Sequence, residues 1–242
     1  MSNLWVFGDS YSADSKDWNS GQKYGAQSLD NTWYELLSKK LKVSNVLLHS
    51  QKGVANEWIY TEVITHQSSF DDGDYVIIQL TSQNRKWFLK DSPELSNIFY
   101  SQIHYNNKDE KKAVEYYKKY LHSDFMDILH YDMLVCALQF MAKTLQKKVK
   151  VLILPGFQPV PGITGTLGDV CNSEFSNFEL QEKYYYHHRA DPRINHMHEE
   201  NHKVLADKIY GFFKKYEHVD LTAGFVSKFI NTNNYKEIQQ IT

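Results

Sequence analysis

Four short apolar runs, separated by longer amphipathic or polar stretches, constrain the fold of this chain most. The runs lie at Leu4–Phe7, Val46–Leu48, Tyr75–Leu80 and Val149–Leu154. Each run has the length of a buried strand, and the stretches between them are long enough for helical crossovers. This alternation is typical of parallel strands joined by helices, so the sequence predicts an α/β fold.

The amphipathic stretches between and after these runs are the candidate helices. The first follows Asn31 or Thr32 with the sequence TWYELLSKKL, and the second reads NEWIYTEVITHQ. A longer helix is expected after Ser123, and a last one reads EENHKVLADKIYGFFKKY. Asn, Thr and Ser are residue types that cap helices. In the longer helix we expect six apolar residues to face the core, namely Phe125, Ile128, Leu129, Leu134, Leu138 and Met141.

The chain of 242 residues shows no repeat, no low-complexity tract and no linker rich in Pro, Gly or Ser. We therefore expect a single domain over 1–242. Two connections are long for a compact fold, an aromatic and polar stretch around 87–107 and a loop around 156–190. Because loops of that length are often functional, we expect the first to form a canopy insertion over the site.

The composition gives no support for several classes of partner. The formal net charge of −2 offers no basic face for nucleic acid or an anionic membrane. No run approaches the roughly 20 apolar residues of a membrane span, and no signal peptide is visible. Cys136 and Cys171 form no disulfide framework. We expect no nucleic acid and no membrane partner, and a protein that is cytoplasmic or released without a signal peptide.

Residues suited to acyl transfer follow three of the predicted strands and precede the last helix. Ser10 lies in LWVFGDSYS, Gly53 in HSQKGVAN and Asn84 in TSQNR, while Asp191 and His196 lie in DPRINHMHEENHKVLA. A serine becomes a nucleophile when a base takes its proton, and the resulting oxyanion needs N–H donors. Taken singly, Ser10 and Asn84 are also ordinary turn or capping residues. Their combination with a glycine and a histidine indicates a hydrolytic site.

These four segments resemble the four sequence blocks of the SGNH/GDSL hydrolase family, which is named for its Ser, Gly, Asn and His. FGDSYS is similar to the first block, SQKGVANEW to the second, TSQNR to the third and NHMHEENHKVLA to the fourth. The resemblance implies a three-layer α/β/α sandwich around a flavodoxin-like parallel sheet of five strands. VCNS at 170–173 and HVDL at 218–221 are the candidates for the fifth strand.

The resemblance also implies a serine esterase that works through an acyl-enzyme, with no cofactor and no metal. Ser10 would be the nucleophile and His196 the base, and the oxyanion hole would comprise the N–H groups of Ser10 and Gly53 and the Asn84 amide. Asp191 is expected to orient His196. Because Asp191 lies five residues before His196, where the family usually has an Asp three residues before, a Ser–His dyad is the alternative.

The sequence departs from the family pattern at three further positions. Ser82 and Arg85 stand where the third block commonly has Gly and Asp, and Arg193 stands where the fourth block has its Asp. The roles of those family residues are therefore not carried over. His202, on the apolar side of the last helix, is expected to pack rather than react. The loop histidines near His196 lack a clear carboxylate or cysteine partner set, so we expect no zinc site there.

Aromatic residues after the third strand indicate the substrate class. Trp87, Phe88 and Tyr100 are the candidate substrate-binding residues, and polar side chains interleave with them. Flat apolar faces bordered by hydrogen-bonding groups suit sugar rings, so we expect a small-molecule or glycan ester, with a carbohydrate O-acetyl ester as the specific hypothesis. A lipase or thioesterase of the same family and a non-catalytic glycan-binding protein on the same fold are the alternatives.

Overall fold

The computed structural model of the chain describes residues 2–13, 31–87, 108–172, 197 and 199–226. The chain divides into two compact units. Unit 1 comprises Met1–Ala13 and Ser44–Val160, and unit 2 comprises Asp14–Val43 and Pro161–Thr242. The single domain over 1–242 stays a prediction.

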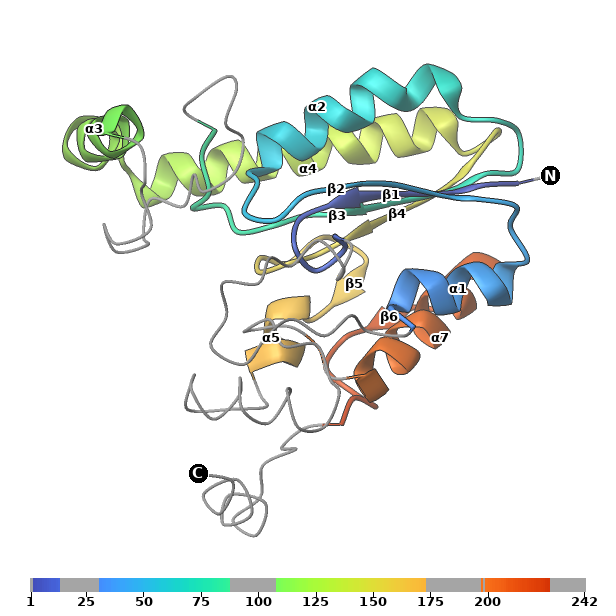
Figure 1. Ribbon diagram of the computed structural model, residues 1–242. Coiled ribbons are helices and arrows are strands. Elements are labelled where there is room, and N and C mark those ends of the chain that lie inside the picture. The colour runs from blue at the N-terminus through green and yellow to red at the C-terminus, as the bar shows by residue number, and fades with distance from the viewer. Residues whose placement is uncertain (1, 14–30, 88–107, 173–196, 198, 227–242) are drawn as a thin grey trace, which may run out of the picture. The chain divides into compact units, whose positions relative to one another are not determined.

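Unit 1 is built on a parallel sheet of four strands (Figure 1). The strands are β1 (Leu4–Gly8), β2 (Val46–Ser50), β3 (Tyr75–Gln79) and β4 (Lys150–Leu154), in the order β2-β1-β3-β4. This is the order of the first four strands in a flavodoxin-like sheet. All four apolar runs are strands, so the predicted α/β fold with parallel strands is confirmed.

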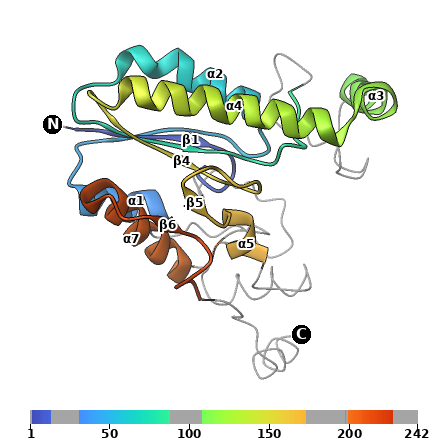
Figure 2. The same cartoon turned by 180° about the vertical axis from the view of Figure 1, so that it is seen from behind.

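Two helices cover one face of this sheet and lie side by side, α2 (Asn56–His66) and α4 (Asp124–Leu145) (Figures 1 and 2). Their buried side chains share one core with the strands, which includes Phe7, Ile59 and Leu138. Ser123 caps α4 as predicted, since its side chain accepts the N–H of Met126. The shorter helical segments of unit 1 are η2 (Gln67–Ser69), α3 (Lys108–Tyr116) and η4 (Tyr117–Leu121).

The core-facing side of α4 differs from the prediction. Phe125, Ile128 and Leu129 are 71%, 47% and 38% exposed, and Leu134 is partly buried, whereas Leu138 and Met141 are buried as expected. The remaining buried residues of the helix are Asp127, Tyr131 and Val135. Because α4 is apolar around most of its circumference, periodicity alone did not identify the buried face.

The apolar composition of α4 also corrects the statement that no run approaches a membrane span. By length and composition α4 could cross a membrane, since an 18-residue stretch has a mean hydropathy of 1.2, and 22% of that stretch is buried. Core helices of soluble proteins meet the same criteria, and α4 packs one side on the sheet. The expectation of no membrane partner therefore stays a prediction.

Unit 2 contains two helices that lie side by side, α1 (Trp33–Leu41) and α7 (Glu199–Lys215) (Figure 2). Thr32, rather than Asn31, is the N-cap of α1, and its N–H donates to the Glu35 carboxylate at 2.8 Å. His202 on α7 is buried, and its Nδ1 accepts the N–H of Trp33 at 3.0 Å. The prediction that His202 packs is confirmed.

Both candidates for the fifth strand are wrong as members of the main sheet. Val219–Asp220 forms β6, but it pairs with β5 (Ile163–Thr164) in a separate two-stranded sheet. Residues 170–172 of the other candidate end α5 (Leu167–Asn172). Thr166 and Asp169 exchange hydrogen bonds at the start of this helix, a reciprocal cap that the sequence analysis overlooked. The expected loop around 156–190 therefore contains a strand and a helix in its described part.

Candidate functional site

The turn that follows β1 presents Ser10 at the carboxyl end of the sheet. β1 ends at Gly8, where an added Cβ would lie 2.6 Å from the side-chain oxygen of Gln79 and 3.0 Å from Ser12 Oγ. That first distance is shorter than any ordinary contact, so a larger residue at this position would displace the Gln79 side chain from its hydrogen bonds. Asp9 is fully buried, and Ser10 is 9% exposed. The predicted placement of Ser10 directly after the first strand is confirmed.

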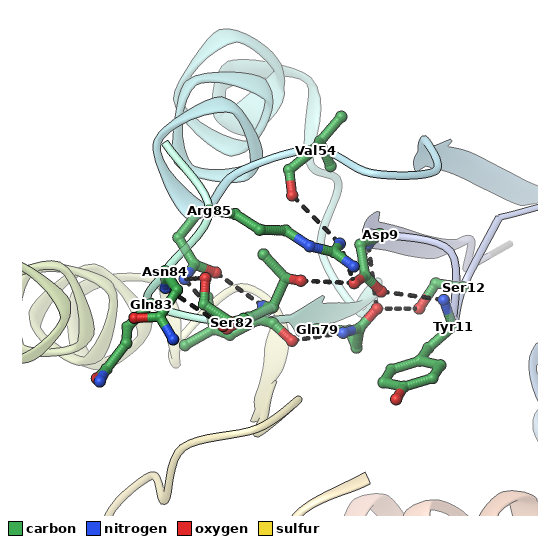
Figure 3. Close-up of polar contacts among 12 residues, drawn as sticks. Asp9, Tyr11, Ser12, Val54, Gln79, Ser82, Gln83, Asn84 and Arg85 are labelled. Carbon is green, nitrogen blue, oxygen red and sulfur yellow. Dashed lines mark hydrogen bonds and ion pairs between the residues drawn. The ribbon is translucent and has the colours of Figure 1, made fainter. Parts of the chain in front are cut away.

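The Asp9 carboxylate ties this turn to the loop that follows β3 (Figure 3). Its Oδ1 accepts the N–H of Tyr11 at 3.0 Å. Its Oδ2 accepts the Thr81 hydroxyl at 2.6 Å and Arg85 Nη1 at 2.7 Å. The Asp9 and Arg85 side chains are 1% and 11% exposed. Hydrogen bonds to a charged group are the stronger kind, so this buried carboxylate holds the two loops in a fixed relation.

Gln79, the last residue of β3, makes a second connection between the same two loops (Figure 3). Its side-chain oxygen accepts the N–H of Asp9 at 3.1 Å and the Ser12 hydroxyl at 3.0 Å. Its amide nitrogen donates to the Leu80 carbonyl. Gln79 is fully buried, and both ends of its amide are engaged. Hydrogen bonds to Gln79 on the neighbouring strand β3 therefore fix the turn around Ser10.

The loop that follows β2 is tied to the same edge of the sheet. The N–H of Gln51 donates to the Gly8 carbonyl at 3.1 Å. Gly53 has a φ of 75°, in the left-handed region that favours glycine. Asn56, at the start of α2, is buried, and it accepts the Thr81 N–H at 2.8 Å and donates to the Thr81 carbonyl at 3.1 Å. The loops after β1, β2 and β3 thus form one connected edge.

Asn84 lies in the turn after β3 and is half-buried. Its N–H donates to Ser82 Oγ at 3.2 Å, and the N–H of Arg85 donates to the Ser82 carbonyl at 3.1 Å. Among the described residues, no hydrogen bond involves the Asn84 side chain. Its amide is therefore available to a ligand. The two departures in this block have structural roles, because Ser82 closes the turn and Arg85 pairs with Asp9.

Of the remaining predicted site residues, the structure describes Trp87 alone. Trp87 is half-buried. His196, Asp191, Phe88 and Tyr100 lie outside the described residues. The structure therefore brings together three of the four predicted segments, those of Ser10, Gly53 and Asn84.

Unit 1 contains a pocket of about 290 Å³, which Gln83 and Arg85, the sequence neighbours of Asn84, help to line; Ser10, Gly53 and Asn84 are not among its lining residues. The loop after β3, the start of α2 and the first half of α4 line it, through Asn56, Glu57, Gln83, Arg85, Lys86, Asp127, His130, Tyr131 and Leu134. Lys86 Nζ lies 3.1 Å from an oxygen of the fully buried Asp127 carboxylate. The two nearly buried cations of the lining, Arg85 and Lys86, are therefore each paired with a buried carboxylate.

Two tyrosines near the pocket stay neutral donors. The Tyr117 hydroxyl donates to Asp127 Oδ1 at 2.6 Å, and burial together with this carboxylate raises the pKa of Tyr117. Burial and, to a lesser degree, Asp132 raise the pKa of Tyr131, whose hydroxyl donates to the Gln158 carbonyl at 3.0 Å. Both phenols are consequently fixed as hydrogen-bond donors at neutral pH.

Sequence reasoning missed the residues that support the site, namely Asp9, Asn56, Gln79, Thr81 and Arg85. One signal was present, because the buried strand YVIIQ ends in a polar residue whose amide must find partners. Comparisons of the chain with models of known protein families and with curated proteins found no match. The relation to the SGNH/GDSL hydrolases accordingly stays a resemblance of motifs.

Proposed function

We propose that this chain is a serine esterase of the SGNH/GDSL type that acts through an acyl-enzyme. The observation that carries the proposal is the joining of the Ser10, Gly53 and Asn84 loops at one edge of the sheet. Strand order reverses between β1 and β3, and such switch points are where open α/β sheets bind ligands. Ser10 and Asn84 follow those two strands.

In the proposed reaction, Ser10 Oγ bonds to the ester carbonyl carbon while His196 takes its proton. The N–H groups of Ser10 and Gly53 and the Asn84 amide bind the oxyanion. His196 then returns the proton to the leaving alcohol as the ester bond breaks. Water, activated by the same histidine, releases the acid and restores Ser10. No metal or cofactor takes part in this scheme.

Asp191 is proposed to orient the imidazole of His196. Asp191→Asn would then leave the ring in the wrong tautomer and lower kcat by several orders of magnitude, about 10⁴-fold in a well-studied triad. A loss below about tenfold would instead assign the orientation of the ring to a backbone carbonyl and the chemistry to a Ser–His dyad.

The proposal includes the finer features of the fold, a three-layer α/β/α sandwich with a five-stranded sheet. The strand order β2-β1-β3-β4 and the helices α2 and α4 on one face of the sheet support it. Among the residues that the structure describes, no fifth strand joins that sheet.

The proposed substrate is a short-chain acyl ester, specifically an O-acetyl ester of a carbohydrate. A pocket of about 290 Å³, lined in part by the turn that carries Asn84, supports a compact substrate over a long aliphatic chain. Trp87, Phe88 and Tyr100 are the proposed sugar-binding residues. A series of chromogenic esters, with acetylated sugars alongside, tests this.

In that series, kcat/KM should fall steeply beyond about four acyl carbons, because a small pocket excludes longer chains. Equal or higher kcat/KM for esters of about eight to twelve carbons would move the protein to the lipase or thioesterase alternative. Glycan binding without turnover of any acetyl ester would favour the non-catalytic alternative.

A further inference from the structure

A cluster of three side chains joins β2 to α2, and the esterase proposal does not use it. His49 is the fourth residue of β2, and Glu62 and His66 lie one turn apart on α2. One ligand atom from each residue lies within 4.8 Å of the other two. His49 is in register with Phe7 on β1. The crossover from β2 to α2 thus brings together residues 13 and 17 positions apart in sequence.

The distances within the cluster match shared coordination of one ion. His49 Nδ1 and His66 Nε2 lie 3.6 Å and 3.7 Å from the same carboxylate oxygen, Oε2 of Glu62. Both separations are too long for hydrogen bonds. Around a tetrahedral Zn²⁺ with ordinary Zn–N and Zn–O bonds, neighbouring ligand atoms lie about 3.4 Å apart. The two histidine–carboxylate separations are therefore within a few tenths of an ångström of that value, and the ligand nitrogens of the two histidines lie within 4.8 Å of each other.

Aromatic packing holds the histidine rings of the cluster, and solvent still reaches all three side chains. The rings of His49 and His66 lie with their centroids 3.9 Å apart, and the Phe7 ring packs 5.1 Å from that of His49. The three side chains are 23%, 26% and 32% exposed, so solvent reaches the cluster and can supply a further ligand.

We propose that His49, Glu62 and His66 bind a divalent metal ion, and that this ion links β2 to α2. Zn²⁺ suits this set of ligands best. Two imidazoles and one carboxylate form a known protein ligand set for Zn²⁺, with one position left for water. Mg²⁺ and Ca²⁺ prefer oxygen ligands and are disfavoured here. The sequence analysis considered only the histidines near His196 and expected no metal. This site stands independently of the esterase proposal.

Isothermal titration calorimetry of the full chain, freed of metal by a chelator, tests the site with Zn²⁺. The unmodified chain should bind one equivalent of Zn²⁺. His66→Gln and Glu62→Gln should each lower the Zn²⁺ affinity at least about 100-fold, because losing a ligand costs more than losing an outer hydrogen-bonding partner. His218→Gln is the matched control, since His218 is outside the cluster and its ring contacts Thr164 in unit 2. This variant should keep the affinity of the unmodified chain.

A second readout is the thermal midpoint of unfolding, which Zn²⁺ should raise in the unmodified chain and in His218→Gln but not in His66→Gln. Circular dichroism checks that each variant is folded, and Glu62→Gln decides the question if His66→Gln is not. The proposal is overturned if the unmodified chain binds no stoichiometric Zn²⁺, if folded cluster variants bind as tightly as the control, or if Mg²⁺ binds equally well.

Discussion

Two buried aspartates lie at opposite edges of the sheet, and both accept hydrogen bonds from a neighbouring segment, but they serve different purposes. Asp74 directly precedes β3, and its carboxylate accepts the Trp5 indole N–H at 2.8 Å and the Asn3 N–H at 2.7 Å. Asp9 directly follows β1 and accepts donors from the loop after β3. Both side chains are fully buried. The difference lies in what each carboxylate holds.

At the amino end, Asp74 accepts neutral N–H groups from Asn3, Trp5 and Asp71, so this carboxylate fixes the start of β1 beside the start of β3. At the carboxyl end, Asp9 pairs with the nearly buried Arg85. A buried ion pair adds little net stability, because desolvating two charges offsets their attraction. We infer that the Asp9 pair is kept for positioning the Ser10 and Asn84 loops. Paired substitutions at the two ends test this contrast.

The largest expected effect is at Ser10. Ser10→Ala should lower kcat for acetyl ester hydrolysis at least about 10³-fold in a folded protein, and His196→Ala should do the same, because the two act as one unit. Ser12→Ala is the matched control at the same turn. This change removes the hydrogen bond from the Ser12 hydroxyl to Gln79 and should lower kcat by less than about tenfold. Equal losses at Ser10 and Ser12 would refute the assignment of the nucleophile.

The next effect is at Asn84. Asn84→Ala should lower kcat about 10²-fold or more, the usual result of removing one oxyanion donor. Asn45→Ala is the control at the amino end, where the Asn45 amide bonds to the side chain of Asn3. Its kcat should be unchanged in steady-state assays. An Asn84 variant with full activity would remove this amide from the oxyanion hole.

A smaller effect is expected when the two aspartates are exchanged for asparagine. Asp9→Asn weakens the hold on Arg85 and should lower kcat by up to about 10²-fold through misplacement of the catalytic loops. Asp74→Asn should lower the free energy of unfolding without changing kcat in the folded fraction. Denaturant titration and steady-state kinetics of both variants measure the contrast. Loss of kcat in Asp74→Asn alone would reverse it.

The smallest expected effect is at Trp5. Trp5→Phe removes the indole donor to Asp74 and should lower the free energy of unfolding by about 1–3 kcal/mol. The Asn3 and Asp71 N–H groups still donate to Asp74 in this variant, so the fold should persist. Urea denaturation gives the loss, and kcat should not change. A variant with reduced kcat and full stability would place the amino end among the functional regions.

The sequence predicted the strands from their continuous apolar runs and most helices from their apolar residues, with a capping residue before α1 and α4. It placed Ser10, Gly53 and Asn84 at strand ends because parallel strands share one carboxyl edge. Ion pairs such as Asp9 with Arg85 escaped it, since their partners lie 76 positions apart and meet only through sheet register. The buried face of α4 escaped it for a different reason, because nearly every face of that helix is apolar.

The most direct test of the central claim is covalent labelling with a serine-directed phosphonate. Peptide mass spectrometry should find a single adduct on Ser10, and labelling should be lost in His196→Ala because the hydroxyl is then not activated. An adduct on Ser12, or no adduct on a folded and unmodified chain, would contradict the account.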